Sequence, residues 1–205
     1  MSVRIKFCGF TRAKDVQLAV ELGVDFIGLI FAPKSPRRVS LAQARELRAL
    51  IPPPIQSVAL LMDNAADEVR EIVRTVQPDI LQFHGGESDA FAASVGLPFW
   101  KVIAMGSEAD PVARFAEYPH AAAFLLDGHG MGEQGGSGKA FDWSKMPQST
   151  AKPVLLAGGL NPGNMGHALQ IAQPWGVDVS SGIESAPGLK DAEKMRAFVY
   201  AARTP

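Results

Sequence analysis

Short apolar runs alternate with amphipathic segments along the whole chain. Eight runs rich in Val, Ile, Leu and Phe have the length and composition of parallel strands covered on both faces. They span residues 3–7, 26–31, 55–62, 80–83, 99–105, 122–126, 154–157 and 177–179. The pattern therefore predicts eight short strands.

The segments between these runs carry helix signals. Ser40 and Gln43 form a capping box ahead of apolar residues spaced by three or four, and Asp110 and Asn161 each precede a proline suited to a first helical turn. Apolar residues at 69, 72, 73 and 76, and again at 195, 198, 199 and 202, repeat the helical spacing. This alternation favours a (β/α)8 barrel, with a doubly wound open sheet as the alternative.

The chain length agrees with a barrel of near-minimal size. Its 205 residues provide about 26 for each of eight βα units, close to the lower limit of roughly 200 residues for this fold. No linker or low-complexity tract divides the chain, so we expect residues 1–205 to form a single barrel domain. The glycine-rich final third favours a closed barrel over an open sheet.

Charge and cysteine content exclude several classes of protein. The formal net charge is −1 and the isoelectric point is about 6.4, which gives no basic footprint for nucleic acid or for an anionic membrane. No apolar run approaches the ~18 residues of a membrane span, and the N-terminus runs directly into a strand pattern. The only cysteine, Cys8, permits neither an internal disulfide nor a cysteine-based zinc site. We expect a cytoplasmic protein.

Several predicted strands end in polar residues that would face one mouth of the barrel, where barrel enzymes carry their catalytic groups. Because residues two apart share a face of a strand, these polar residues fall into pairs, with Asp127 following the sixth strand. The pairs are Lys6 with Cys8, Gln82 with His84, and Asp178 with Ser180.

These residues admit ordinary structural roles as well. Cys8 is either a packed apolar residue or a reactive one, and its position before Gly9 favours reactivity. Lys6 is best interpreted as a core lysine paired with an acid such as Asp178. A Schiff-base role for Lys6 or Lys101 stays a minority alternative. His84 fits packing or substrate positioning better than acid–base chemistry, and no histidine shows metal-ligand spacing.

Glycine-rich segments follow the last three predicted strands, at 135–139, 157–159 and 180–182. Backbone N–H groups in such loops can surround a phosphate, and barrels often bind phosphate after strands 7 and 8. We therefore predict phosphate binding. The G-x-G-x-x-G match at 130–135 lacks a following helix and an acidic partner, and Lys139 lacks a P-loop context, so we expect no nucleotide cofactor.

A basic segment, Pro-Lys-Ser-Pro-Arg-Arg at 33–38, follows the second predicted strand. An arginine held beside prolines at the active face could bind a carboxylate through two hydrogen bonds. A solvated charged loop is the alternative.

In their order and spacing, these motifs resemble the phosphoribosylanthranilate isomerase family of tryptophan biosynthesis. The resemblance covers nearly the whole chain, with Phe7 and Phe83 standing where Ile and Leu are more usual. The matching segments are 6–11 (KFCGFT), 33–37, 82–85 (QFHG), 126–127, 135–139 (GGSGK) with 141–143, 156–162 (LAGGLNP), and 178–184 (DVSSGIE) with 187–188.

The resemblance implies an Amadori rearrangement that converts N-(5-phosphoribosyl)anthranilate into an open-chain 1-deoxyribulose 5-phosphate. It implies Cys8 as the general base and Asp127 as the general acid, which must keep its proton with the help of apolar surroundings. Arg37 would bind the anthranilate carboxylate, although its neighbour Arg38 is the alternative. Phosphate would bind to Gly136, Ser137, Gly138, Gly158, Gly159, Ser180, Ser181 and Gly182, and Lys6, Gln82, His84 and Asp178 would help to position the substrate.

No cofactor or metal is expected, because the substrate's own iminium acts as the electron sink. Another phosphosugar barrel enzyme, such as an epimerase, an aldolase or the indole-forming synthase, is the alternative among enzymes. A non-catalytic phosphate-binding barrel is the alternative outside them. The sequence leaves open whether the protein is a monomer or a homodimer, and whether it associates with other tryptophan-pathway enzymes.

Overall fold

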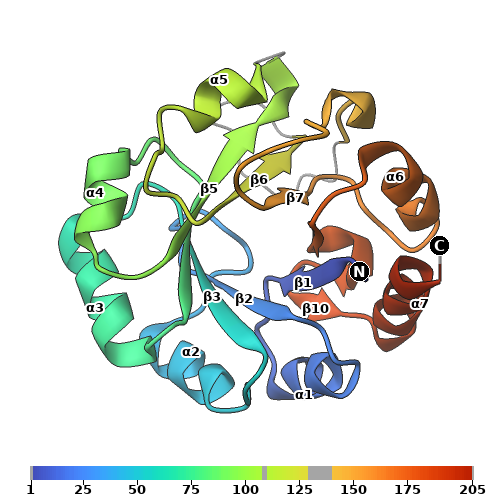
Figure 1. The fold of residues 1–205 in the computed structure, drawn as a ribbon. Coiled ribbons are helices and arrows are strands. Elements are labelled where there is room, and N and C mark those ends of the chain that lie inside the picture. Colours follow the sequence, from blue (N-terminus) through green and yellow to red (C-terminus); the bar gives the residue numbers. More distant parts are fainter. Residues whose placement is uncertain (1, 108–109, 129–139, 205) are drawn as a thin grey trace.

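Eight parallel strands close into a barrel surrounded by helices in the computed structural model, which describes residues 2–107, 110–128 and 140–204 (Figure 1). Each strand pairs with the next in sequence, and β8 pairs with β1 to close the ring. The predicted (β/α)8 barrel is therefore confirmed, and the open-sheet alternative is wrong. The strands are β1 (Arg4–Cys8), β2 (Phe26–Ile30), β3 (Gln56–Leu61), β4 (Ile80–Phe83), β5 (Phe99–Ala104), β6 (Ala123–Asp127), β7 (Val154–Leu156) and β8 (Gly176–Val179).

Helices lie outside the barrel after most strands. They are α1 (Ala13–Glu21), α2 (Leu41–Arg48), α3 (Ala66–Val76), α4 (Asp89–Ser94), α5 (Pro111–Phe115), α6 (Met165–Ala172) and α7 (Ala192–Arg203). Three 3-10 turns complete the set: η1 (Met105–Ser107), η2 (Trp143–Lys145) and η3 (Ser181–Ile183). Between β6 and β7, the described residues contain η2 in place of an α-helix. A short hairpin of β9 (Glu184–Ala186) and β10 (Leu189–Lys190), which the sequence pattern did not predict, follows β8.

Local capping explains where several helices begin. The Ser40 side chain accepts a hydrogen bond from the Gln43 amide at α2, and Asp110 accepts one from the Val112 amide at α5, as the sequence predicted. At α6 the prediction was wrong by three residues. Asn161 instead caps a turn by accepting from the Gly163 amide, and the helix begins after Asn164.

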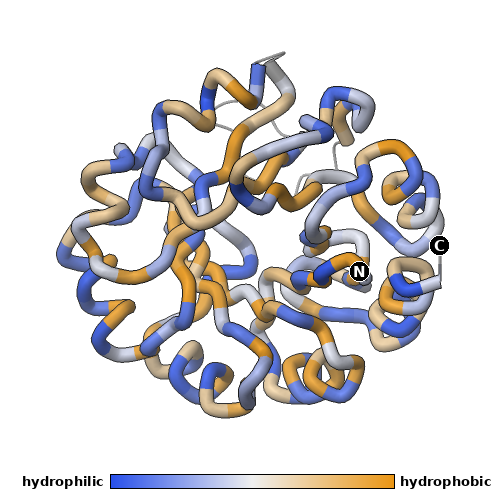
Figure 2. The backbone as a smooth tube through the Cα atoms, viewed as in Figure 1, coloured by the Kyte–Doolittle hydropathy of each residue, from blue (hydrophilic) through white to orange (hydrophobic). Residues whose placement is uncertain are grey.

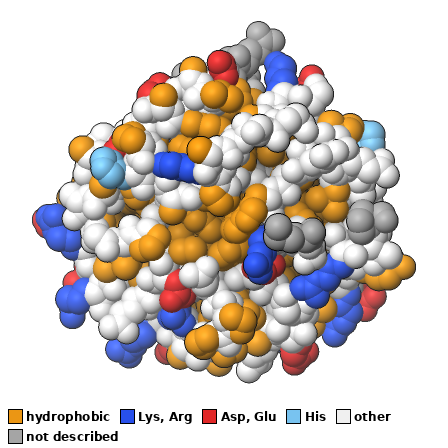
Figure 3. All heavy atoms as spheres, viewed as in Figure 1, with side chains coloured by type: hydrophobic (Ala, Val, Ile, Leu, Met, Phe, Trp, Pro, Cys, Tyr) orange, Lys and Arg blue, Asp and Glu red, His pale blue; other side chains and the backbone are white. Residues whose placement is uncertain are grey.

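Apolar side chains form two layers, one between the strands and the helices and one inside the barrel. Figure 2 shows the hydrophobic colour concentrated on the strands, with hydrophobic and hydrophilic positions alternating along the surrounding helices. The inner layer contains Phe26, Trp100 and Leu125, so the barrel is filled below the site. In Figure 3, hydrophobic side chains gather near the centre of the face that is drawn. Among the described residues, no helix is long and apolar enough to cross a membrane.

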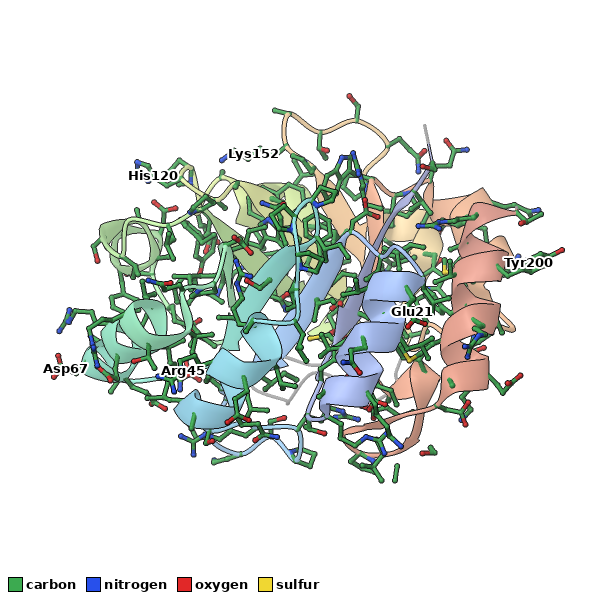
Figure 4. All side chains as sticks on the ribbon, turned by 90° about the horizontal axis from the view of Figure 1, so that it is seen from below. Glu21, Arg45, Asp67, His120, Lys152 and Tyr200 are labelled. Carbon is green, nitrogen blue, oxygen red and sulfur yellow. The ribbon has the colours of Figure 1, made fainter. Side chains whose placement is uncertain are left out.

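The loops at the two ends of the barrel show which end holds the carboxyl ends of the strands. His120 and Lys152 precede β6 and β7 and lie at the upper end in Figure 4, so the carboxyl ends of the strands point to the opposite end. Asp67 and Tyr200 mark the outer sides of α3 and α7. The polar residues predicted to form a site follow the strands and therefore belong to the carboxyl end.

Candidate active site

A pocket opens at the carboxyl ends of the strands and brings together most of the predicted site residues. Its polar lining comes from β1, β6 and β8 and from the loops after β2, β4, β7 and β8. The predicted site residues on its wall are Cys8, Arg37, His84, Asp127, Gly158, Gly159, Asp178, Ser180 and Ser181. Residues more than 170 positions apart in the sequence thus share one cavity because the barrel closes between β8 and β1.

Cys8 ends β1 with its side chain almost fully buried in the pocket wall. Gly28 lies opposite it on β2, and a Cβ at position 28 would come within 2.7 Å of the Cys8 sulfur. The sequence does not indicate this role of Gly28, since a glycine inside an apolar strand carries no signal of what it faces. The absent side chain leaves room for the thiol.

Lys6 lies beneath Cys8 and is fully buried. Its Nζ donates to Asp178 Oδ1 at 2.8 Å, as the core pairing predicted. Burial disfavours the Lys6 ammonium, but the charges of Asp178 and Cys8 favour it by more, and the pKa of Lys6 is therefore raised. Lys6 supplies a fixed positive charge below the pocket.

The charge state of Cys8 results from opposing effects. Burial raises the pKa of the Cys8 thiol, and this effect outweighs the lowering by the positive charge of Lys6. Asp178 adds to the increase. The charge of Lys6 thus favours the thiolate, but burial has the larger effect and the pKa of the Cys8 thiol stays raised.

Asp127 and His84 complete the polar wall. Asp127 is the last residue of β6 and is buried, with Leu125 and Leu126 preceding it in the strand. His84 follows β4, where its amide donates to the Leu61 carbonyl at 2.8 Å. Gln82 is buried one pleat below and, unlike His84, is absent from the pocket lining in the described part of the chain. Gln82 and Lys6 therefore lie under the pocket, where direct substrate contact is not expected.

The two adjacent arginines have different environments. Arg37 is buried and lines the pocket, whereas Arg38 is half exposed and pairs with Glu68 on α3 at 3.1 Å. Arg37 donates from Nε and Nη2 to both carboxylate oxygens of Glu184, at 2.7–3.1 Å. Nη1 and the second Nη2 hydrogen are not part of this pair. Of the two neighbouring arginines, Arg37 therefore lines the pocket.

The loops after β7 and β8 form the opposite wall. Gly158 and Gly159 both have positive φ angles, 83° and 68°, which glycine adopts at no steric cost. Asn164 Nδ2 donates to the Gly159 carbonyl at 2.9 Å and fixes the loop. Ser180 Oγ is buried and has no hydrogen-bond partner among the described residues. These features support the predicted phosphate site.

Gly182 has a structural reason to be glycine. A Cβ at this position would lie 1.9 Å from the Leu160 carbonyl oxygen, so the backbone of η3 packs directly against the loop after β7.

We expect Gly182→Ala to lower the free energy of unfolding by about 1–3 kcal/mol through overpacking, measured by chemical denaturation. Gly166→Ala is the matched control, because a Cβ there would meet no atom within 4 Å. Equal stabilities of the two variants would contradict this packing argument.

Some predicted residues lie elsewhere. Gly136, Ser137 and Gly138 fall outside the described residues. Lys101 faces away from the barrel interior, where it pairs with Glu87 at 3.3 Å and lies 5.1 Å from the centre of the Tyr118 ring. This placement removes Lys101 from consideration as a Schiff-base lysine of the pocket.

The structure also adds residues that the sequence did not suggest. Apolar side chains form the pocket wall next to Cys8, and Ser35 lies beside Arg37. The apolar residues are Ile30, Ala32, Leu60 and Met62. The buried partners Glu184 and Lys190 were also missed as functional residues. Although Glu184 and Lys190 pair with each other six positions apart, their contacts to Arg37 and to the Cys8 carbonyl join segments far away in the sequence, which no local pattern marks.

A family model and curated relatives match nearly the whole chain. Residues 5–201 match the family model of N-(5'-phosphoribosyl)anthranilate (PRA) isomerase. The N-(5'-phosphoribosyl)anthranilate isomerase of Xanthomonas oryzae pv. oryzae is 54% identical over 206 residues, which cover 98% of this chain and 93% of that protein.

Solved structures agree with the sequence match. Phosphoribosyl anthranilate isomerase from Thermotoga maritima is 33% identical and superposes with a TM-score of 0.89, covering 99% of this chain and 100% of that one. A phosphoribosyl anthranilate isomerase in complex with reduced 1-(o-carboxyphenylamino)-1-deoxyribulose 5-phosphate is 29% identical, with a TM-score of 0.83 and coverage of 99% and 100%. The chain belongs to the N-(5'-phosphoribosyl)anthranilate isomerase family.

Proposed function

We propose that this chain isomerises N-(5'-phosphoribosyl)anthranilate to 1-(o-carboxyphenylamino)-1-deoxyribulose 5-phosphate, a step of tryptophan biosynthesis, with Asp127 as general acid and Cys8 as general base. One observation carries the residue assignments. The two groups line the same pocket, together with a buried arginine at one side and the glycine loops after β7 and β8 at the other. A phosphorylated aryl-amino sugar needs sites for a phosphate and a carboxylate, with acid–base chemistry between them.

The first step is opening of the sugar ring. The Asp127 carboxyl group donates a proton to the furanose oxygen, the bond from that oxygen to C1 breaks, and the nitrogen lone pair forms the C1=N iminium. Asp127 suits this step because it is buried at the end of an apolar strand, and low polarity helps a carboxyl group to keep its proton.

The second step is removal of the C2 proton. The Cys8 thiolate accepts it, the C–H electron pair forms a C1=C2 bond, and the iminium electrons return to nitrogen. The resulting enolamine becomes the ketone when the C2 hydroxyl loses its proton and C1 gains one. Burial raises the pKa of the Cys8 thiol in the free pocket, so the cationic iminium, together with Lys6, is what favours the thiolate.

The pocket walls support one orientation of the substrate. The phosphate lies against Gly158, Gly159 and the buried Ser180 hydroxyl, and the aryl ring lies against the apolar wall at β2 and β3, with its carboxylate at Arg37. A turnover assay tests the proposal. Phosphoribosylanthranilate fluorescence should disappear faster with the protein than without it. The product should be the open-chain ketose, with a keto group at C2. An unchanged rate would refute the activity.

Arg37→Ala should raise KM by about tenfold to a hundredfold while kcat changes little, because the carboxylate contact stabilises bound substrate and transition state alike. Arg38→Ala is the matched control, since the Arg38 side chain bonds only to the partly exposed Glu68 among the contacts described for it. Steady-state kinetics of both variants check the assignment. A larger defect in Arg38→Ala would assign the carboxylate to the other arginine.

A further inference from the structure

Three charged side chains form a buried cluster beside the pocket: Arg37, Glu184 and Lys190. Each exposes less than a tenth of its surface. Glu184 accepts hydrogen bonds from Arg37 at 2.7–3.1 Å and from Lys190 Nζ at 2.7 Å. Of the three, only Arg37 belongs to the described pocket lining. Glu184 is therefore shared between an arginine that faces the pocket and a lysine behind it.

The contacts of Lys190 favour its charged form and oppose burial, which lowers the pKa of this lysine. Its Nζ donates to Glu184, to the Cys8 carbonyl at 2.5 Å and to the Ser180 carbonyl at 3.2 Å, and it lies 5.5 Å from the centre of the Phe10 ring. Three acceptors require three N–H donors, which only the ammonium form provides. The aromatic face adds a further favourable contact for a cation.

The charge balance of the cluster has a consequence for the pocket. Arg37 and Glu184 alone would be a neutral pair, and an incoming carboxylate would meet no surplus charge. With Lys190 on the same carboxylate, the cluster carries one net positive charge, which is costly in a buried site until an anion arrives. The side of Arg37 left open to the pocket is where an anion can neutralise it.

We propose that Lys190 is a positioning residue for carboxylate specificity: by sharing Glu184, it leaves Arg37 with the surplus positive charge that selects a substrate bearing a carboxylate. This inference rests on the proposed function, since it takes the aryl carboxylate to bind at Arg37. Lys190 would thus influence substrate selection from outside the pocket. Its loss should weaken binding of the carboxylate end of the substrate and leave the rest of the binding unchanged.

Two probes separate this role from a structural one. The first is reduced 1-(o-carboxyphenylamino)-1-deoxyribulose 5-phosphate, and the second is its phenylamino counterpart without the carboxylate. The ratio of their dissociation constants, measured by calorimetry, reports carboxylate discrimination. We expect Lys190→Met to reduce this ratio by about tenfold, as expected for loss of a close buried charge. Affinity for the probe without the carboxylate should stay near that of the parent.

Matched controls use two other lysines. Lys194→Met removes an exposed charge whose Nζ donates to the backbone carbonyl of Glu184 at 2.7 Å. Lys101→Met removes a lysine that is equally buried but paired with Glu87 outside the barrel. Both variants should keep the parent ratio. Should Lys190→Met fail to fold, Lys190→Gln removes the charge while keeping N–H donors, and the same fall is expected.

Arg37→Ala completes the set and separates the two proposals. If Arg37→Ala keeps the discrimination, the carboxylate site of the proposed function is wrong. If Arg37→Ala abolishes it while the Lys190 variants keep the parent ratio, the proposed function stands and the role of Lys190 is overturned. Equal loss of affinity for both probes in the Lys190 variants would also overturn it, because that is the result of a purely structural role.

Discussion

Cys8→Ala should lower kcat by about 10² to 10⁴, the usual contribution of a general base, while KM changes little. Cys8→Ser should be almost as slow, because a hydroxyl is a far weaker acid than a thiol and forms little of its anion. The fold should tolerate both changes, since Gly28 leaves space around this side chain. Steady-state kinetics measure the effect. A kcat within about tenfold of the parent would remove Cys8 from the base role.

The pH profile gives this expectation a second readout. Burial raises the pKa of the Cys8 thiol, so the thiolate fraction of the free enzyme grows as pH rises through that pKa. Over the pH range in which Asp127 keeps its proton, kcat/KM should rise with the thiolate fraction, and it should fall where Asp127 loses that proton. Because Cys8 is the only cysteine, the pH dependence of its alkylation rate reports the same ionisation. The rising limb of the kcat/KM profile should share its midpoint with the alkylation profile. A kcat/KM that does not change while alkylation accelerates would contradict the assignment.

Asp127→Asn should also lower kcat by about 10² to 10⁴, because an amide cannot supply the proton that opens the sugar ring. The side chain keeps nearly the same shape, so the affinity for reduced 1-(o-carboxyphenylamino)-1-deoxyribulose 5-phosphate should stay within a few-fold of the parent. Loss of turnover with retained binding is the expected signature of a group that acts in the transition state.

Asp110→Asn is the matched control for this change. Asp110 caps α5 by accepting from the Val112 amide at 2.9 Å, and asparagine caps helices about as well as aspartate. Turnover of this variant should equal that of the parent. Substantial turnover by Asp127→Asn, measured beside it, would show that another group delivers the proton.

The sequence by itself determined the strand order and the composition of much of the site. Strands buried on both faces must be short and apolar, so the predicted runs agree with the observed strands to within a residue or two at each end. Cys8, Asp127 and Asp178 were found because barrel chemistry gathers where such strands end. The capping residues Ser40 and Asp110 were predicted because their hydrogen bonds are local.

Only the tertiary structure decided which distant groups meet. Arg37 and Glu184 are 147 positions apart, and their pairing exists because the barrel closes between β8 and β1 and brings β9 and β10 beside the loop after β2. The same closure seats Lys190 against the Cys8 carbonyl. Local sequence patterns indicate burial and helix capping, because these depend on near neighbours. The sharing of the Glu184 carboxylate between Arg37 and Lys190 depends instead on closure of the barrel.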